Sequence, residues 1–581
     1  MHGDMKKTLI LASVLMLSVS CEGLLDRYPE DTVTPESYFK TATDFELWSN
    51  AFYAMIPGQD LAVMNGDDVV DNDPQSCIKG ARSAATETWS WTQLRNINYM
   101  LENSTQCTDQ AVRDRWNAVA YFFRAYFYFA KVREYGDVPW YDCVIGSGDE
   151  ELLQKSRDDR ALVMYRVMED FDRAAAALPS AKSVAQVTKW TALAMKARAA
   201  LYEGSFRKYH ALADVSVDGR TIGADYFLSE AAEAAKAVID GGQYKLATGA
   251  TIYRDMFVAE DANADEYILA RVYGDILGND VRHDIVNSGT GLTKRFMNHY
   301  LLSNGKRITS VAGYETMSFA EETSGRDPRL AQTVQCAGSK FYGSKIAYLK
   351  GVTGYQPIKY ESVAAKNSSG KGTFDVPVIR YPEVLLTYAE ARAELGTLTQ
   401  EDINLTVNAI RSRVGMPGMS LEAANADPDL LLASYYPHAD RTGANFGVIL
   451  EIRRERTVEL VMEGLRQWDM MRWKEGAMMV NHDNPYYGAY IASEGVIDYD
   501  GDGTADFEIY SSNPVSSLSS KFKTGVDINL SEGTFGSIIA YKDVDYTWNE
   551  ERDYLWPIPA AQRVLNHNLT QNPGWADGLD F

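Results

Sequence analysis

The sequence is poor in cysteine, and the five that it has follow no metal-binding pattern. Zinc sites take closely spaced pairs of cysteine or histidine ligands, and the chain has no Cys-x-x-Cys. A zinc site is therefore excluded. Besides Cys21, the cysteines are Cys77, Cys107, Cys143 and Cys336. Their wide spacing leaves open whether they form disulfides.

The motifs of common enzyme classes are also missing. The chain contains no Gly-x-Ser-x-Gly, no His-Glu-x-x-His and no Gly-Lys-Thr, the patterns that hold a nucleophile, a catalytic zinc or a nucleotide phosphate. Its seven histidines form no ligand pair at helical spacing. The sequence therefore gives no support to a catalytic nucleophile or to a fold that holds a catalytic cofactor, and we single out no catalytic residue.

Basic residues are fewer than acidic ones: 57 lysines and arginines stand against 80 aspartates and glutamates, which gives a formal net charge of −23. This balance argues against a nucleic acid or an anionic lipid surface as partner. Beyond the N-terminal region no run is long and apolar enough for a membrane helix, which takes about 20 residues. With 45% hydrophobic residues over 581 positions, the chain can bury a large core.

The N-terminal segment has the layout of a bacterial lipoprotein signal. Two lysines precede an apolar run at 8–19, which is too short to span a bilayer, and Cys21 follows directly before an acidic stretch. We expect residues 1–20 to be removed and Cys21 to carry the lipid anchor. An ordinary secretory signal or a buried helix stays open, because Ser18 stands where such signals usually have leucine.

The first half of the chain predicts packed helices. The segment 116–135 repeats a small residue four places before an aromatic one and ends at Gly136, a helix stop signal. Further helices are predicted, mostly rich in alanine, at 161–178, 188–204, 226–240, 383–395 and 402–414. Alanine-rich faces favour close stacking, so we expect a mostly α fold, a superhelical scaffold resembling tetratricopeptide repeats. A generic helical bundle stays open, since no strict repeat period is found.

The segment between these helices differs in character. Residues 245–380 are rich in Gly, Ser, Tyr and Asn, with short β pieces such as 267–273. Loops on a rigid frame are common recognition surfaces. We expect one domain over 21–581, with a helical frame at about 40–245 and 380–475 and an irregular, ligand-binding half at about 245–380 and 476–581. A two-domain split near 245 stays open.

Four glutamates make an acidic stripe in the segment 448–473. Glu451, Glu455, Glu459 and Glu463 follow one another at i, i+4 spacing beside several arginines. Two of them could be the acid and base of a glycosidase. The structural alternative, a network of ion pairs tying this helix to its neighbours, is favoured because carboxylates on one stripe need not flank a cleft.

An acidic turn near the C-terminus has the spacing of a calcium loop. Carboxylates stand at positions one, three, five and nine and a glycine at six, although the bidentate glutamate at position twelve is missing. The predicted ligands of a structural calcium ion are Asp498, Asp500, Asp502, Thr504 and Asp506. A solvated acidic turn without metal is the alternative.

Motifs along the whole chain match one known family. The matching segments are Leu24-Leu-Asp26, Pro35, Tyr38-Phe39, Arg124-Ala-Tyr-Phe-Tyr-Phe129, Arg133-Glu-Tyr-Gly-Asp-Val-Pro139, Arg326-Asp-Pro-Arg329, Arg380-Tyr-Pro-Glu-Val-Leu-Leu386, Ala389-Glu-Ala391, Glu455-Arg456, Glu459-Leu460, Glu463-Gly464, Arg466, Trp468-Asp469, Leu555-Trp-Pro-Ile-Pro559 and Asn568-Leu-Thr-Gln-Asn-Pro-Gly574. Each is weak alone, but their order is specific. The chain resembles the SusD/RagB-type outer-membrane nutrient-binding lipoproteins.

This resemblance implies a binding protein rather than an enzyme. Members of the family are lipid-anchored at the outer membrane of Gram-negative bacteria and exposed at the cell surface. They capture an oligosaccharide, a polysaccharide or another nutrient and cap a SusC-like TonB-dependent transporter. A peptide ligand is the first alternative for this chain, and a repeat scaffold that binds only proteins is the second.

Candidate ligand contacts are aromatic and polar residues in predicted loops. Sugar rings stack their apolar faces on aromatic rings, while their hydroxyls pair with polar side chains. The early region, which the family often uses for its ligand, offers Asp67, Asp68, Trp89 and Trp91. The irregular half adds Tyr273, Phe296, His299 and Tyr300. Core packing is the alternative for each, and the sugar itself is not specified.

Overall fold

The computed structural model describes residues 38–58, 66–71, 74, 78–85, 89–274, 289–339, 348–349, 351–361, 372–480 and 486–581. The predicted signal and Cys21 lie outside these residues, so the lipid anchor stays a prediction. No described helix is long and apolar enough to cross a membrane.

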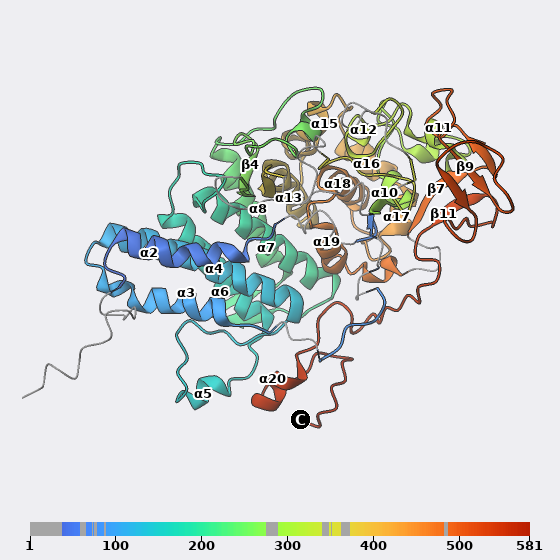
Figure 1. Ribbon diagram of the computed structural model, residues 1–581. Coiled ribbons are helices and arrows are strands. Elements are labelled where there is room, and N and C mark those ends of the chain that lie inside the picture. Colours follow the sequence, from blue (N-terminus) through green and yellow to red (C-terminus); the bar gives the residue numbers. More distant parts are fainter. Residues whose placement is uncertain are drawn as a thin grey trace, which may run out of the picture.

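Helices make up most of the regular structure, as predicted (Figure 1). They are α2 (Ala42–Ser49), α3 (Thr92–Asn103), α4 (Gln110–Tyr135), α5 (Glu150–Leu153), α6 (Arg160–Ala177), α7 (Lys189–Tyr209), α8 (Ala224–Asp240), α9 (Ile252–Asp255), α10 (Lys294–Met297), α11 (Phe319–Thr323), α12 (Leu330–Thr333), α13 (Tyr381–Glu394), α14 (Gln400–Leu405), α15 (Val407–Arg413), α16 (Leu421–Ala426), α17 (Leu430–Tyr435), α18 (Phe446–Glu459), α19 (Arg466–Arg472) and α20 (Ala560–Leu565). Short 3-10 helices are η2 (Asn50–Met55), η4 (Ser104–Gln106), η6 (Ile308–Ser310), η7 (Tyr314–Thr316) and η9 (Gly476–Met479).

The strands are short and belong to small separate sheets. They are β1 (Val69–Val70), β2 (Val215–Val217), β3 (Arg220–Ile222), β4 (Tyr267–Arg271), β5 (Gly291–Leu292), β6 (Val376–Arg380), β7 (Tyr487–Ile491), β8 (Gly495–Ile497), β9 (Phe507–Tyr510), β10 (Lys521–Lys523) and β11 (Gly536–Ile539). β4 pairs antiparallel with β6, which joins the two ends of the irregular segment before α13.

Successive helices of the frame pack side by side in the order α4, α6, α7, α8, α13 and α18. Local signals set their ends: Asp109 caps α4 through the amides of Ala111 and Val112, and Gly136 ends it at a φ of 73°. Small residues allow close packing. A Cβ on Gly204 of α7 would lie 2.8 Å from the side chain of Leu228 on α8. The alanine-rich faces therefore stack as the sequence predicted.

Two predicted helices are wrong in extent. The segment 402–414 forms α14 and α15, because Thr406 leaves the helical region with a ψ of −90°. In the acidic segment, α18 ends at Glu459 since Met462 and Gly464 adopt left-handed φ values of 61° and 75°. Glu463 therefore lies in the turn after α18, not on the same helix.

All four glutamates of the acidic segment are buried and ion-paired, as the structural interpretation predicted. At the centre, Arg380 contacts Glu463 at 2.6 Å, Glu266 at 2.6 Å and Glu459 at 3.2 Å. Burial alone would raise the pKa of Glu459, but Arg413, Arg380 and further arginine charge outweigh it and lower that pKa to about 2. These glutamates are thus held charged by arginines inside the fold.

The calcium prediction concerns the turn between β8 and β9. Ligand oxygens of Asp498, Asp500 and Asp506 lie within 4.8 Å of one another. Oxygens that bind one calcium ion at about 2.3–2.6 Å have this separation, so three of the five predicted ligands fit the ion. Asp502 and Thr504 are not in this group, and calcium stays a prediction.

We expect the substitution Arg380→Met to destabilise the protein strongly. It would leave the carboxylates of Glu266, Glu459 and Glu463 with less countercharge in the interior, and breaking a buried pair costs about 3–5 kcal/mol of unfolding free energy. The control Lys236→Met breaks the exposed pair with Asp240, which is worth less than about 1 kcal/mol. Denaturant unfolding measures both, and equal losses would contradict the role of the network.

We expect calcium to raise the midpoint of thermal unfolding, because the ion would relieve repulsion among three clustered carboxylates. The substitution Asp498→Asn should remove most of this effect, whereas Asp545→Asn, at an exposed acid outside the turn, should preserve it. Calorimetric titration gives the direct measurement. No heat of binding at millimolar calcium would overturn the prediction.

Candidate functional site

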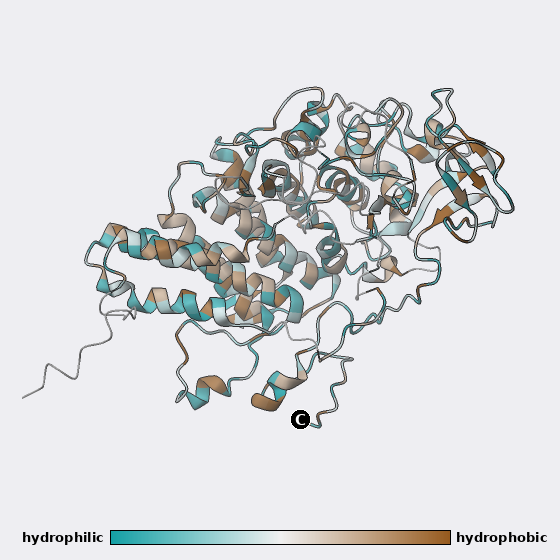
Figure 2. Ribbon diagram, viewed as in Figure 1, coloured by the Kyte–Doolittle hydropathy of each residue, from teal (hydrophilic) through white to brown (hydrophobic). Residues whose placement is uncertain are grey.

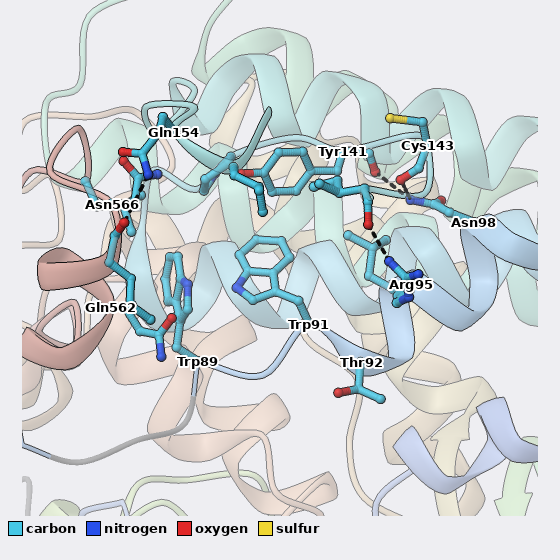
Figure 3. Close-up of a pocket in the computed structure, with 16 residues that line it drawn as sticks. Trp89, Trp91, Thr92, Arg95, Asn98, Tyr141, Cys143, Gln154, Gln562 and Asn566 are labelled. Atoms are coloured by element: carbon cyan, nitrogen blue, oxygen red, sulfur yellow. Dashed lines mark hydrogen bonds between the residues drawn. The ribbon is translucent and has the colours of Figure 1, made fainter. Parts of the chain in front are cut away.

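A cavity of about 600 Å³ opens where α3, α5, α20 and the loop after α4 meet (Figure 3). The chain segments that form it are far apart in sequence. Its lining residues are Trp89, Trp91, Thr92, Leu94, Arg95, Asn98, Pro139, Tyr141, Cys143, Ile145, Leu153, Gln154, Gln562, Leu565, Asn566 and Leu569. We call this cavity the aromatic pocket.

Three aromatic rings give the pocket its character. The rings of Trp89 and Trp91 meet edge to face with centroids 5.2 Å apart, and Trp91 meets Tyr141 in the same way at 5.6 Å (Figure 3). Behind them, Trp89 packs on Tyr135, and Trp91 packs on Phe127. The core therefore supports all three rings: Trp89 is buried at 9% exposure, whereas Trp91 and Tyr141 are half-buried and keep more free surface in the cavity.

Hydrogen bonds from a buried asparagine, Asn98, fix the loop that carries Tyr141. The side-chain amide of Asn98 donates to the carbonyl oxygens of Tyr141 and Cys143 at 3.1 and 3.0 Å. Arg124 donates to Asn98 at 3.4 Å and forms an ion pair with Asp170 at 2.6 Å. This chain of contacts runs from α6 through α4 and α3 to the pocket, so the wall is preformed.

Exposed leucines line the mouth of the pocket, and hydrogen bonds connect its two sides. Leu153 on α5 is 45% exposed and Leu565 on α20 is 70% exposed. Figure 2 shows apolar residues on both of these short helices. The side-chain amide of Gln154 donates to the carbonyl oxygen of Leu565 at 3.0 Å. The side-chain amide of Asn568 donates to the backbone carbonyl oxygen of Gln154 at 2.6 Å. These bonds hold the two sides of the mouth together.

Polar groups at the pocket are few. Among its described lining residues Arg95 is the one charged side chain, and one of its N–H groups donates to the carbonyl oxygen of Ile145. Thr92 and Gln562 add a hydroxyl and an amide. This arrangement can stack a ring and make a small number of hydrogen bonds.

The glutamates considered for glycosidase chemistry are not among the lining residues and are ion-paired elsewhere.

The predicted acidic pair lies in the interior instead. Asp67 is 1% exposed and contacts Arg466 through both carboxylate oxygens, at 2.6 and 2.9 Å. Asp68 is 2% exposed. Burial and the adjacent charge of Asp67 raise the pKa of Asp68 to about 7, against the opposing charge of Arg466. This burial argues against contact with a ligand.

The predicted residues of the irregular half are also mostly enclosed. Phe296, His299 and Tyr300 are at most 1% exposed, within and directly after α10. The two ring nitrogens of His299 contact the hydroxyl of Tyr436 and the backbone carbonyl oxygen of Arg295. Burial lowers the pKa of His299 to about 3. Tyr273 is half-buried. Apart from Tyr273, these side chains serve packing.

Two of the eight predicted ligand contacts, Trp89 and Trp91, therefore line the aromatic pocket. Sequence reasoning missed Tyr141 and the amides from the C-terminal segment. The pair Trp140-Tyr141 directly after a helix stop was a usable signal, since aromatic residues in a loop are candidates for recognition. For Gln562 and Asn566 no local signal exists, because only the fold brings α20 to α3.

Comparisons with known proteins agree on one family. The model of the SusD family matches residues 278–575, and a model described as "Starch-binding associating with outer membrane" matches residues 60–201. SusD-like protein P2 of Formosa agariphila is 25% identical over 512 residues, which cover 81% of this chain and 92% of the relative. SusD-like protein P38 of the same organism is 24% identical, over 80% of this chain and 90% of the relative.

Solved structures show the same fold. A SusD-like protein of Bacteroides fragilis superposes with a TM-score of 0.68 at 21% identity and covers 94% of this chain and 100% of its own. A protein described as a laminarin-binding SusD-like protein superposes with a TM-score of 0.53 at 18% identity, covering 92% of this chain and 100% of its own. Because the matching family model spans more than half of the sequence, the chain belongs to the SusD family.

Proposed function

We propose that this protein captures a carbohydrate in the aromatic pocket at the cell surface and delivers it to a SusC-like TonB-dependent transporter of the outer membrane. One observation carries the proposal. Trp89 and Trp91, which the sequence predicted as stacking residues, line one cavity together with Tyr141, and the ring of Trp91 contacts both of the other rings.

The chemistry of the pocket suits a pyranose ring. Each sugar ring has an apolar face of C–H groups, and an aromatic ring in contact with it excludes water from both. The hydroxyls at the ring edge need donors and acceptors, which Thr92, Arg95 and Gln562 supply. The preformed wall adds affinity, because no loop has to be ordered when the ligand binds.

Two observations, the family and Cys21, support the proposed location of the protein at the outer membrane. One matching model is described as associating with the outer membrane, which a lipid on Cys21 would provide. Attachment through one end leaves the folded body free to lie over a transporter. The protein then acts as a binding subunit, and chemical breakdown of the glycan falls to other proteins.

We expect Trp91→Ala to weaken carbohydrate binding about tenfold or more, the equivalent of about 1.4 kcal/mol, because a stacking surface is lost. Calorimetry against laminarin, soluble starch and a set of peptides measures the effect. Trp116→Ala, a half-buried tryptophan of α4 outside the pocket, is the matched control. Gln562→Ala tests the rim without removing a ring that packs on the core.

The outcomes separate the alternatives. Unchanged carbohydrate binding by Trp91→Ala and Gln562→Ala would remove the aromatic pocket as the site. Binding of peptides alone would favour the peptide-binding alternative, and binding of neither would favour a scaffold for proteins.

We expect a Cys21→Ala protein to be released from the cell into the medium, since it would lack the residue that receives the lipid. Immunoblots of membrane and medium fractions measure this. If the variant stays in the membrane fraction, a protein partner rather than a lipid holds it there.

A further inference from the structure

A small cavity lies among the helices of the frame, between α4, α7, α13, α18 and α19. Its volume is about 20 Å³, which is room for one occupant of the size of a water molecule. None of its lining residues lines the aromatic pocket. We call it the arginine cavity, because four of its lining residues are Arg133, Arg198, Arg456 and Arg472.

Three of these four arginines are ion-paired with carboxylates inside the frame. The pairs are Arg198 with Glu383, Arg456 with Asp469, and Arg472 with both Asp469 and Glu390. The fourth arginine, Arg133, forms no ion pair with a residue that the structure describes. The carboxylates in contact with the arginines therefore carry less charge than the four guanidinium groups.

Aromatic rings surround Arg133 in place of a carboxylate. Its guanidinium carbon lies 3.8 Å from the ring centroid of Trp468 and 5.3 Å from that of Phe129. Burial lowers the pKa of Arg133, and repulsion from Arg198 adds to this effect, while Glu134 opposes it without forming an ion pair. An anion beside Arg133 would therefore stabilise its charge.

Three donor groups of the residues that line this cavity have no acceptor. They are Nε of Arg133, Nη1 of Arg456 and the hydroxyl of Tyr202, all of them buried and without a hydrogen-bond partner among the described residues. Arg456 is 3% exposed and Tyr202 is 4% exposed, so bulk water does not supply the missing acceptor. Buried donors are nearly always satisfied, and these three therefore indicate an occupant of the cavity.

The chemistry of the lining favours a monatomic anion over a water molecule. A water molecule brings two protons that need acceptors, but the carboxylate that lines the cavity, Asp469, already accepts from Arg456 and Arg472. A chloride ion has no protons, accepts from several donors at once and supplies negative charge. Phosphate, sulfate and sugars are too large for about 20 Å³.

We propose that the arginine cavity binds one chloride ion, which is the internal counter-ion of Arg133 and Arg456 and accepts a hydrogen bond from the hydroxyl of Tyr202. The ion connects α4 and α7 with α18, so its binding stabilises the helical frame. The proposal does not depend on the carbohydrate function, since the two cavities share no lining residue.

Bromide locates the site directly, because it is a heavier monatomic anion that replaces chloride and scatters X-rays anomalously. Crystals of the protein soaked in sodium bromide should show an anomalous peak in the arginine cavity, beside Arg133 and Arg456. Bromide peaks at the protein surface alone, with a water molecule or nothing in the cavity, would overturn the proposal.

In solution, chloride should raise the midpoint of thermal unfolding, because the site exists only in the folded protein. For a chain of 581 residues we expect a rise of about 1 °C for each tenfold increase in chloride above its dissociation constant. Sodium gluconate keeps the ionic strength constant, since its anion is too large for the cavity. Equal midpoints in chloride and in gluconate would contradict the site.

Variants connect this effect to the cavity. Arg133→Met removes the unpaired cation, so its midpoint should not depend on chloride and should be no lower than that of the wild type in gluconate. Arg133→Lys keeps the charge and should retain most of the chloride dependence. Tyr202→Phe removes one hydroxyl and should weaken chloride binding severalfold. The matched control Tyr244→Phe, at a tyrosine 5% exposed outside the cavity, should leave it unchanged.

The outcomes are distinct. If Arg133→Met lowers the midpoint equally in chloride and in gluconate, Arg133 acts through packing and the proposal is wrong. If Arg133→Met does not fold, Tyr202→Phe and the bromide peak decide: a variant that responds to chloride as Tyr244→Phe does, or a cavity without bromide, refutes the site.

Discussion

The buried charges around α18 are the constraint on which the rest of the fold depends. Arg380 at the end of β6 contacts carboxylates of the segment before β4, of α18 and of the turn after α18. Arg329, from the irregular half, contacts Glu459 at 3.0 Å. One network thus joins the helical frame to the irregular segments. Removing one partner leaves a buried charge without compensation, so arrangements of these segments in which the charges do not meet are disfavoured.

The same principle, polar contacts between distant segments, builds the aromatic pocket. The C-terminal segment returns to the end of α4. There the side-chain amide of Asn572 donates to the carbonyl oxygen of Tyr135 at 2.9 Å, and the backbone amide of Trp556 donates to the backbone carbonyl oxygen of Glu134 at 2.7 Å. These bonds place α20 beside α3. A binding wall made of the first and last parts of the chain therefore exists only once the whole chain has folded.

The sequence predicted those features of the structure that depend on residues close together in the chain, and it did not predict those that depend on distant residues. Alanine-rich helices were predictable because their period and caps are local, and Trp89 and Trp91 were found as aromatic residues near a helix start. The break at Thr406 depends on a backbone conformation that helical periodicity does not show. Gln562 lines the pocket because distant segments pack together, and a single sequence does not show such packing.

The ligand candidates that proved buried show why irregular sequence is a poor guide to exposure. The irregular half has its own hydrophobic core, in which Phe296 and Tyr300 pack with Tyr253 and Phe257. Asp67 looked like a loop carboxylate, yet it compensates Arg466 in the interior. A segment without helical period can still bury its aromatic rings, because loops that pack on one another exclude water as helices do. Exposure is therefore decided by tertiary packing, and recognition surfaces lie only where that packing leaves a supported ring uncovered.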